Sequence, residues 1–134
     1  MSLYKFEWRG DFDNAALNLL HAEAFAHPPD THDWVSQVKS HSLGWVCAYD
    51  NEALVGFVNV VWDGALHAFI LDTAVAASAQ RHGVGRDLVQ EAAAKAAEAG
   101  CIWLHADFED ALKNFYFNAY KFVPTNAGLV SLHR

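Results

Sequence analysis

The chain has 134 residues, of which 53% are hydrophobic and 13% aromatic, a composition that predicts one folded domain over residues 1–134 and excludes a disordered protein. Its formal net charge of −7 argues against a nucleic-acid-binding protein, which normally carries a clustered basic face. No apolar run approaches the roughly 20 residues that cross a bilayer, and the first residues lack a basic region followed by an apolar one, so we expect a cytoplasmic protein with no membrane partner.

Residue types that bind metals are scattered along the chain. Cys47 and Cys101 both lie in apolar, strand-like runs and form no Cys-x-x-Cys motif, so we expect buried, reduced thiols. The 8 histidines include no pair at the spacing of zinc ligands. We therefore predict no metal site.

The first elements are a strand and a helix. Residues 3–8 alternate between apolar and polar side chains, which is the period of an edge strand. A helix follows, with Asp11 or Asp13 as its N-cap and apolar residues at helical spacing. We expect the pair Pro28-Pro29 to end this helix, because proline donates no backbone hydrogen bond.

A second, shorter helix and three strands come next. Thr31 or Asp33 can cap the helix. The three strands are predicted at residues 43–49, 54–62 and 66–75. A tight hairpin turn at Asp63-Gly64 joins the last two. The last strand is almost continuously apolar, which predicts a central strand buried on both faces.

The joint between this strand and the next helix is the most informative stretch. Residues 80–86 read Gln-Arg-His-Gly-Val-Gly-Arg, and helical periodicity continues from Val84 to an expected stop at Gly100. Glycines leave the N–H groups of the turn uncovered, and the first N–H groups of a helix have no internal acceptor. The loop is therefore predicted to bind a phosphate group, with Arg81 and Arg86 adding charge-assisted hydrogen bonds.

Three positions of this loop resemble the signature of the GNAT superfamily of acyl-CoA-dependent N-acetyltransferases, Gln/Arg-x-x-Gly-x-Gly/Ala. Gln80, Gly83 and Gly85 occupy its fixed positions, and the preceding strand ends in Ala74-Val75 at the usual distance. A second strand, a helix and an aromatic cluster follow at the spacing of the family. The sequence therefore resembles GNAT proteins over nearly its whole length.

The resemblance implies an α/β fold with one mixed sheet of about six or seven strands, antiparallel in its N-terminal part, and about four flanking helices. Residues 101–106 would form a strand parallel to residues 66–75 and splayed from it, which opens a cofactor cleft. A last helix would start at residues 107–110. Residues 122–124 and 128–132 would supply two short closing strands.

The resemblance also implies acetyl-CoA as the acyl donor, bound as a substrate. A backbone N–H near Val75 would polarise the thioester carbonyl. The implied cofactor-binding residues are Thr73, Ala74, Val75, Gln80, Arg81, His82, Gly83, Val84, Gly85, Arg86, Phe115 and Tyr116.

The general base is the first point where the chain departs from the family. Many GNAT proteins carry a glutamate on the central strand, or on the next parallel strand in the pattern Leu-Glu-Val. This chain has Leu71 at the first position and His105, within Leu-His-Ala, at the second. An unperturbed imidazole titrates near neutral pH, so His105 is a candidate catalytic base, with a purely structural histidine as the alternative. Asp72 and His67 are further candidates.

The general acid of the family is often a tyrosine in the pattern Tyr-x-x-x-Gly-Phe. Counting back from Phe122 without gaps places Phe117 at that position rather than Tyr116, and Lys121 replaces the glycine. One residue rotates a helical position by about 100°, but a one-residue bulge in the helix would restore Tyr116 to the site. Phe115 and Tyr116 also resemble the Phe-Tyr pair of the family, so Tyr116 is the predicted catalytic acid.

The function implied is transfer of an acetyl group from acetyl-CoA to a primary amine of a small molecule or peptide, by direct attack in a ternary complex. In GNAT proteins the helices after the first strand line the acceptor side, so Trp34 and residues 25–33 are candidates for amine contact, with core packing as the alternative.

A non-catalytic acyl-CoA-binding sensor is the alternative function, because the usual glutamate is missing. A dinucleotide-binding domain is excluded because the loop lacks a third glycine. Since aromatic residues are numerous and small GNAT domains often pair, we also predict a homodimer.

Overall fold

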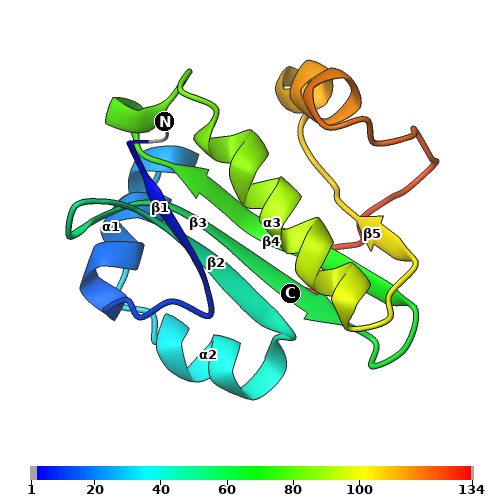
Figure 1. Cartoon of the computed structure of the whole chain (residues 1–134), viewed down its shortest axis with the longest axis horizontal. Helices are drawn as coiled ribbons and strands as arrows, with labels where there is room; N and C mark the ends of the chain where they lie inside the picture. The colour runs from blue at the N-terminus through cyan, green and yellow to red at the C-terminus, as the bar shows by residue number, and fades with distance from the viewer. Residues whose placement is uncertain (1–2, 134) are drawn as a thin grey trace.

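Five strands form one sheet in the order β1-β2-β3-β4-β5 (Figure 1). The computed structural model describes residues 3–133, except for the Ala119 side chain. The strands are β1 (Lys5–Trp8), β2 (Gly44–Asp50), β3 (Ala53–Trp62), β4 (His67–Val75) and β5 (Trp103–His105). Neighbouring strands are antiparallel except for the parallel pair of β4 and β5. The predicted mixed α/β sheet is confirmed, but it has fewer strands than expected.

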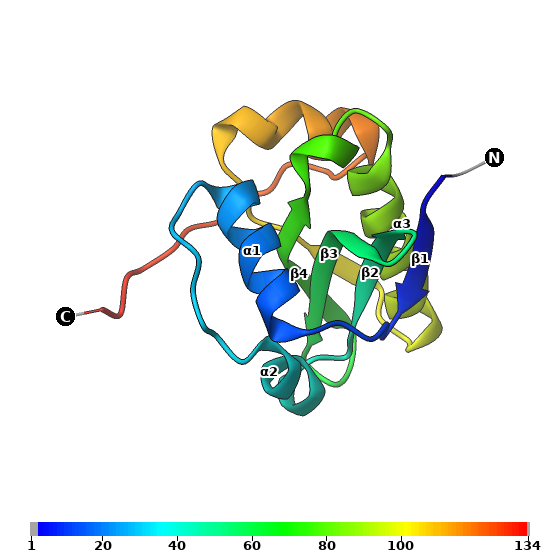
Figure 2. The same ribbon diagram turned by 90° about the vertical axis from the view of Figure 1, so that its left-hand side faces the viewer.

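Helices cover both faces of the sheet. The helical elements are α1 (Asn14–Phe25), α2 (Trp34–His41), the 3₁₀ turn η1 (Ala77–Ala79) and α3 (Val84–Glu98). α1 and α2 lie on one face and α3 on the other (Figures 1 and 2), and each face has its own buried cluster, with Leu17 and Phe57 in one and Leu88 in the other. Cys47 and Cys101 are buried, free thiols, as predicted. Within residues 3–133, none of the helices has the length and apolar character needed to span a membrane.

Aspartate caps start both N-terminal helices. The Asp13 carboxylate accepts a hydrogen bond from the Ala16 N–H at 2.7 Å, and the Asp33 carboxylate accepts one from the Ser36 N–H at 3.1 Å. Of the alternative caps, the structure therefore selects Asp13 and Asp33. α1 ends at Ala26, whose backbone is left-handed with φ 53°, so the helix stops by reversing its backbone before it reaches the predicted proline stop.

β4 is not the fully buried central strand that its apolar run predicted. Phe69 is 37% exposed and Leu71 is 39% exposed, whereas Ile70 between them is buried. Alternate residues of a strand face opposite sides of the sheet. The cluster under α1 and α2 includes Ala74 but not Phe69 or Leu71. Near β5, therefore, only the α3 side of β4 is fully covered.

The C-terminal part departs most from the predictions. β5 is shorter than the predicted strand at residues 101–106, and a 3₁₀ turn, η2 (Asp110–Leu112), and a π-helical turn, η3 (Phe115–Ala119), replace a regular last helix. The described tail, residues 121–133, contains no strand, so both predicted closing strands are wrong. A strand needs a partner for its backbone groups, and the local pattern that suggested these two strands does not specify one.

Candidate active site

A β-bulge in β4 lies at the centre of the candidate site. The register of β3 and β4 shifts between Phe57 and Asn59, so that one residue of β3 lies opposite two residues of β4, Asp72 and Thr73. Asp72 has φ +58°, in the left-handed region that non-glycine residues seldom adopt. A bulge re-aims the side chains around it. As a result, Asp72 contacts a histidine of α1, while Thr73 contacts Tyr116 of η3.

β4 and β5 separate next to this bulge. Their parallel pairing ends at Phe69 and His105, whereas β4 continues to Val75 (Figure 1). No other strand within residues 3–133 pairs with β4 on that side. On that side, the second half of β4 therefore has no strand partner within the described residues.

The glycine loop joins the end of β4 to α3. Gln80 Nε2 donates a hydrogen bond to the Val75 carbonyl oxygen at 3.3 Å, so the first fixed residue of the motif holds the loop against the strand. Gly83 is the N-cap residue of α3, with φ +80° and no side-chain cap. Arg86 is exposed, with its Nε 3.7 Å from the Asp87 carboxylate. The N–H groups of the first turn of α3 therefore meet no side-chain cap and are available to an anion.

Two further loop side chains extend away from the glycine turn. Arg81 is exposed and has a left-handed backbone, with φ 66°. His82 Nδ1 lies 2.8 Å from the hydroxyl oxygen of Tyr4, and the two rings stack with centroids 6.2 Å apart. His82 therefore connects the loop to the segment before β1, a contact that the motif did not indicate.

Gly85 brings the loop into contact with η3. A Cβ atom at this position would lie 3.4 Å from the Phe115 ring and 3.7 Å from a methyl group of Val75. The Phe115 ring stands edge-on to Tyr116, with 4.9 Å between centroids and 90° between planes. The structure therefore brings together the loop, the end of β4 and the two aromatic residues predicted to bind the cofactor.

Tyr116, rather than Phe117, faces β4. Its side chain is 5% exposed, is hydrogen-bonded to the Thr73 side chain and stacks on Phe108 at 4.3 Å. Burial raises the pKa of the Tyr116 phenol, so the hydroxyl keeps its proton at neutral pH. Phe117 instead packs edge-on to Phe108 at 5.2 Å. The wider π-helical turn of η3 is the kind of helix bulge that brings Tyr116 into this register.

His105 lies at the edge of the sheet near the point where β4 and β5 separate. Its Nε2 atom is 2.8 Å from His67 Nδ1, and its ring stacks on Phe69 with centroids 4.4 Å apart. His105 is exposed. The structure therefore brings two of the candidate bases, His105 and His67, together on the side of the sheet that faces away from α3.

The sequence interpretation missed two histidines next to Asp72. His21 Nε2 of α1 lies 3.1 Å from Asp72 Oδ1, and His21 Nδ1 lies 2.7 Å from His27 Nε2. The side chains of His21 and Asp72 are 19% and 27% exposed. The sequence gives only one signal for this cluster, which is that His21 lies near the end of α1 and His27 just after it. Within the described residues, no group of three His, Cys, Asp or Glu side chains is arranged to hold a metal ion, this one included.

Trp34 belongs to the core and presents little surface to an amine. It is 8% exposed, its indole N–H donates to Asn18 Oδ1 at 2.9 Å, and its ring packs against His21 at 5.2 Å. Asn18 Nδ2 in turn donates to the His32 carbonyl oxygen. Trp34 therefore supports His21 and the segment of residues 25–33.

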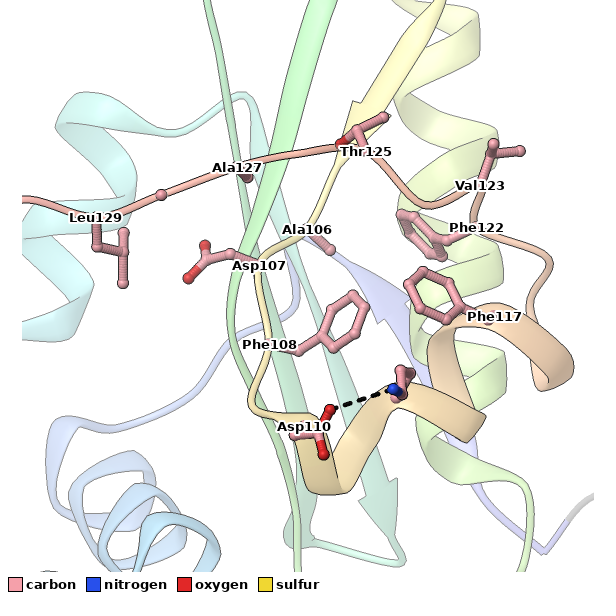
Figure 3. Close-up of a pocket in the computed structure, with 12 residues that line it drawn as sticks. Ala106, Asp107, Phe108, Asp110, Phe117, Phe122, Val123, Thr125, Ala127 and Leu129 are labelled. Atoms are coloured by element: carbon pink, nitrogen blue, oxygen red, sulfur yellow. Dashed lines mark ion pairs between the residues drawn. The ribbon is translucent and has the colours of Figure 1, made fainter.

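A pocket of about 470 Å³ lies between the segment after β5, η3 and the tail (Figure 3). Phe108 and Phe117 line it, and an ion pair joins Asp110 Oδ1 to Lys113 Nζ at 3.3 Å. None of its lining residues belongs to the loop at residues 80–86. The pocket is therefore distinct from the predicted phosphate site.

The site therefore combines a mixed sheet, whose parallel pair of strands separates, with a helix start that has no side-chain cap. The sequence profile of the acetyltransferase (GNAT) family matches residues 3–118. This match spans most of the chain, and the protein therefore belongs to the GNAT acetyltransferase family. A search of curated proteins found no match.

Solved structures share the fold at low sequence identity. A protein of unknown function from methicillin-resistant Staphylococcus aureus, described as a probable acetyltransferase, has a TM-score of 0.79 at 20% identity and covers 97% of this chain and 99% of its own. A GNAT family acetyltransferase from Streptococcus pneumoniae has a TM-score of 0.77 at 24% identity, with 98% of each chain covered. A Trypanosoma brucei acetyltransferase has a TM-score of 0.78 at 13% identity and covers 96% of this chain and 99% of its own. These likenesses establish the fold.

Proposed function

We propose that the protein is a cytoplasmic N-acetyltransferase that moves an acetyl group from acetyl-CoA to a primary amine, on a small molecule or a peptide, by direct attack in a ternary complex. The β4 bulge carries the proposal. From two consecutive residues, the Asp72 side chain reaches the α1 side of the sheet and the Thr73 side chain reaches the buried phenol of Tyr116. Acetylation of an amine needs a proton acceptor for the amine and a proton donor for the leaving thiolate. The Asp72 carboxylate and the Tyr116 phenol are the proposed acceptor and donor.

The loop at residues 80–86 is the proposed site for the pyrophosphate of acetyl-CoA. The uncapped N–H groups at the start of α3 and the helix dipole favour an anion there. Arg81 and Arg86 are exposed on the same loop and would add charge-assisted hydrogen bonds. The acyl arm would then follow the open side of β4, where a backbone N–H near Val75 would polarise the thioester carbonyl.

The reaction requires two proton transfers. The amine nitrogen attacks the acetyl carbonyl carbon, and collapse of the tetrahedral intermediate breaks the C–S bond. The amine gives a proton to the Asp72 carboxylate, with His105 as the second candidate, and the thiolate takes the phenolic proton of Tyr116. Because burial raises the pKa of Tyr116, the phenol is protonated before each turnover. The net charge of −7 favours approach of a cationic amine.

Release of free CoA from acetyl-CoA over a panel of amines tests the proposal. At least one amine should raise the rate above the amine-free value, and acetyl-CoA should raise the melting temperature of the protein. Binding of acetyl-CoA without release for any amine would favour the alternative, a non-catalytic acyl-CoA sensor. Absence of acetyl-CoA binding would overturn both functions.

A further inference from the structure

We propose that His21 and His27 form, with Asp72, a proton-accepting chain that takes up the proton lost by the acceptor amine. The inference rests on the proposed function and adds two residues that no motif in the sequence indicates. It follows from the hydrogen-bond geometry at the end of α1.

Three contacts at hydrogen-bond distance join this chain end to end. Asp72 Oδ1 lies 3.1 Å from His21 Nε2, His21 Nδ1 lies 2.7 Å from His27 Nε2, and His27 Nδ1 lies 2.7 Å from the Pro28 carbonyl oxygen. The chain runs from the β4 bulge to the loop after α1, and Figure 2 shows α1 beside β4. Both nitrogen atoms of both imidazoles are therefore engaged.

The acceptors at the two ends fix how many protons the chain needs. The Pro28 carbonyl oxygen can only accept, so His27 carries a proton on Nδ1. A neutral His27 then has a bare Nε2, which accepts from the Nδ1–H of His21. A neutral His21 would present its own bare Nε2 to the Asp72 carboxylate, and two acceptors form no hydrogen bond.

One additional proton completes the chain. With that proton, His21 is an imidazolium ion whose Nε2–H donates to Asp72, and all three hydrogen bonds are made. The new bond joins opposite charges and is therefore among the stronger kinds. Two neutral imidazoles beside an ionised Asp72 thus leave one contact without a hydrogen, and proton uptake relieves it.

No further titratable group contacts the chain among the described residues. The other neighbours of His21 are the rings of Phe25 in α1, at 4.4 Å, and Trp34 in α2, at 5.2 Å. The other titratable side chains of the segment between α1 and α2 are engaged elsewhere. Asp30 accepts from the Thr31 N–H, His32 hydrogen-bonds to a side chain of α2, and Asp33 caps that helix. Proton uptake is therefore a property of Asp72, His21 and His27 alone.

The proton enters the chain at the bulge. The described contacts of Asp72 use only Oδ1, so Oδ2 accepts the amine proton as the new N–C bond forms. The protonated carboxyl group then turns about its Cβ–Cγ bond and passes this proton to His21 Nε2, which leaves a carboxylate paired with an imidazolium. After product release the proton returns to solvent, and the neutral chain is restored. His21 and His27 act through Asp72 and are positioning residues.

Asp72→Asn and His21→Gln test the proton count while keeping the contact between residues 21 and 72. In Asp72→Asn the amide Nδ2–H donates to the bare Nε2 of a neutral His21, and asparagine tolerates the left-handed backbone at this position. In His21→Gln the amide nitrogen reaches the place of Nε2 and donates to Asp72, but it cannot take up a proton. His41→Gln, which changes an exposed histidine at the end of α2 outside the chain, is the matched control.

We expect Asp72→Asn to keep the melting temperature of the parent. His21→Gln should remain folded at a lower melting temperature, because it loses the ring contacts with Phe25 and Trp34. Asp72→Asn should lower kcat/KM for the amine by about 10²-fold or more, the range of a lost general base. His21→Gln should lower it less and change its dependence on pH, while His41→Gln should leave both unchanged. Parental kcat/KM and pH profile in His21→Gln would overturn the inference.

Nitrogen-15 NMR of the imidazoles tests the chain without any substrate. We expect His27 to carry its proton on Nδ1, because its Nδ1 atom faces the Pro28 carbonyl oxygen. A proton on His27 Nε2 instead would overturn the inference. Because these spectra need no amine, failure of every amine in the panel would count against the proposed function alone.

Discussion

Tyr116→Phe removes one oxygen atom from the proposed proton donor and keeps its ring. The Tyr116 side chain is 5% exposed and stacks on Phe108 at 4.3 Å, so phenylalanine fills the same space. The hydrogen bond to Thr73 is lost, which costs about 0.5–1.5 kcal/mol net. For a domain of this size, each kcal/mol lowers the melting temperature by roughly 3–6 °C. The variant should therefore remain folded with a small loss of stability.

The effect on turnover should be much larger than the effect on stability. Loss of a general acid lowers kcat by about 10²–10⁴-fold, whereas KM for acetyl-CoA should change little because the ring contacts remain. Steady-state release of the CoA thiol measures both. Tyr120→Phe removes a hydroxyl just after the same turn and is the matched control. Parental turnover in Tyr116→Phe would refute the reasoning and show that the phenol only packs.

The same variant isolates a contribution of pH to stability. Burial raises the pKa of Tyr116 above that of an unfolded tyrosine, so the folded state holds the phenolic proton more tightly. The associated stability is fully present below the unfolded pKa of about 10 and is lost as the pH rises through the folded-state pKa. In denaturant unfolding, the parent should therefore lose more stability than Tyr116→Phe above about pH 10. Parallel losses in the two proteins would contradict this assignment.

Four other predictions test the cofactor loop, the second candidate base, the packing of β1 and the association state. Gly85→Glu should abolish the rise in melting temperature caused by acetyl-CoA, because a carboxylate enters the anion site. Gly85→Ala should keep this rise, because its Cβ would lie no closer than 3.4 Å to any neighbouring atom. His105→Ala should lower kcat/KM by less than Asp72→Asn, and the opposite order would make His105 the proton acceptor. Gly44→Ala should lower the free energy of unfolding in urea by about 1–3 kcal/mol, since its Cβ would lie 2.1 Å from the Trp8 ring; an unchanged midpoint would contradict that contact. Sedimentation at micromolar concentrations should show a homodimer, because the C-terminal tail exposes several apolar side chains, and a monomer alone would refute it.

The features that were predicted correctly from the sequence depend on near neighbours. Asp13 and Asp33 each cap a backbone N–H three residues further along the chain. Spacing therefore limited each cap to two candidates, and the structure chose between them. Gly83 adopts the positive φ that ends the loop and starts α3. Local chemistry of this kind fixes where β4 ends and where α3 begins.

The features that were missed depend on partners far along the chain. Asp72 and His21 are 51 residues apart, and the bulge that joins them needs a left-handed aspartate that no pattern signals. The predicted closing strands in the tail failed for a similar reason, since a strand pattern does not name its partner. Counting back from Phe122 left both Tyr116 and Phe117 as candidates for the catalytic position. The sequence does not signal the π-helical turn that turns Tyr116 toward β4.

One extra residue in β4 decides the chemistry on both faces of the sheet. In a regular strand, alternation from Leu71 would turn Asp72 toward α3 and Thr73 toward α1. The bulge reverses this order, and Ala74 packs in the cluster under α1 while Val75 packs in the cluster under α3. The left-handed backbone at Asp72 costs roughly 1–2 kcal/mol, and strain of this kind is concentrated at functional sites. The bulge therefore holds Asp72, the proposed proton acceptor, and Thr73, the partner of the proposed donor Tyr116, on opposite faces of one strand. In the proposed reaction, the amine would reach a thioester lying along that strand from one face and the phenol would reach it from the other.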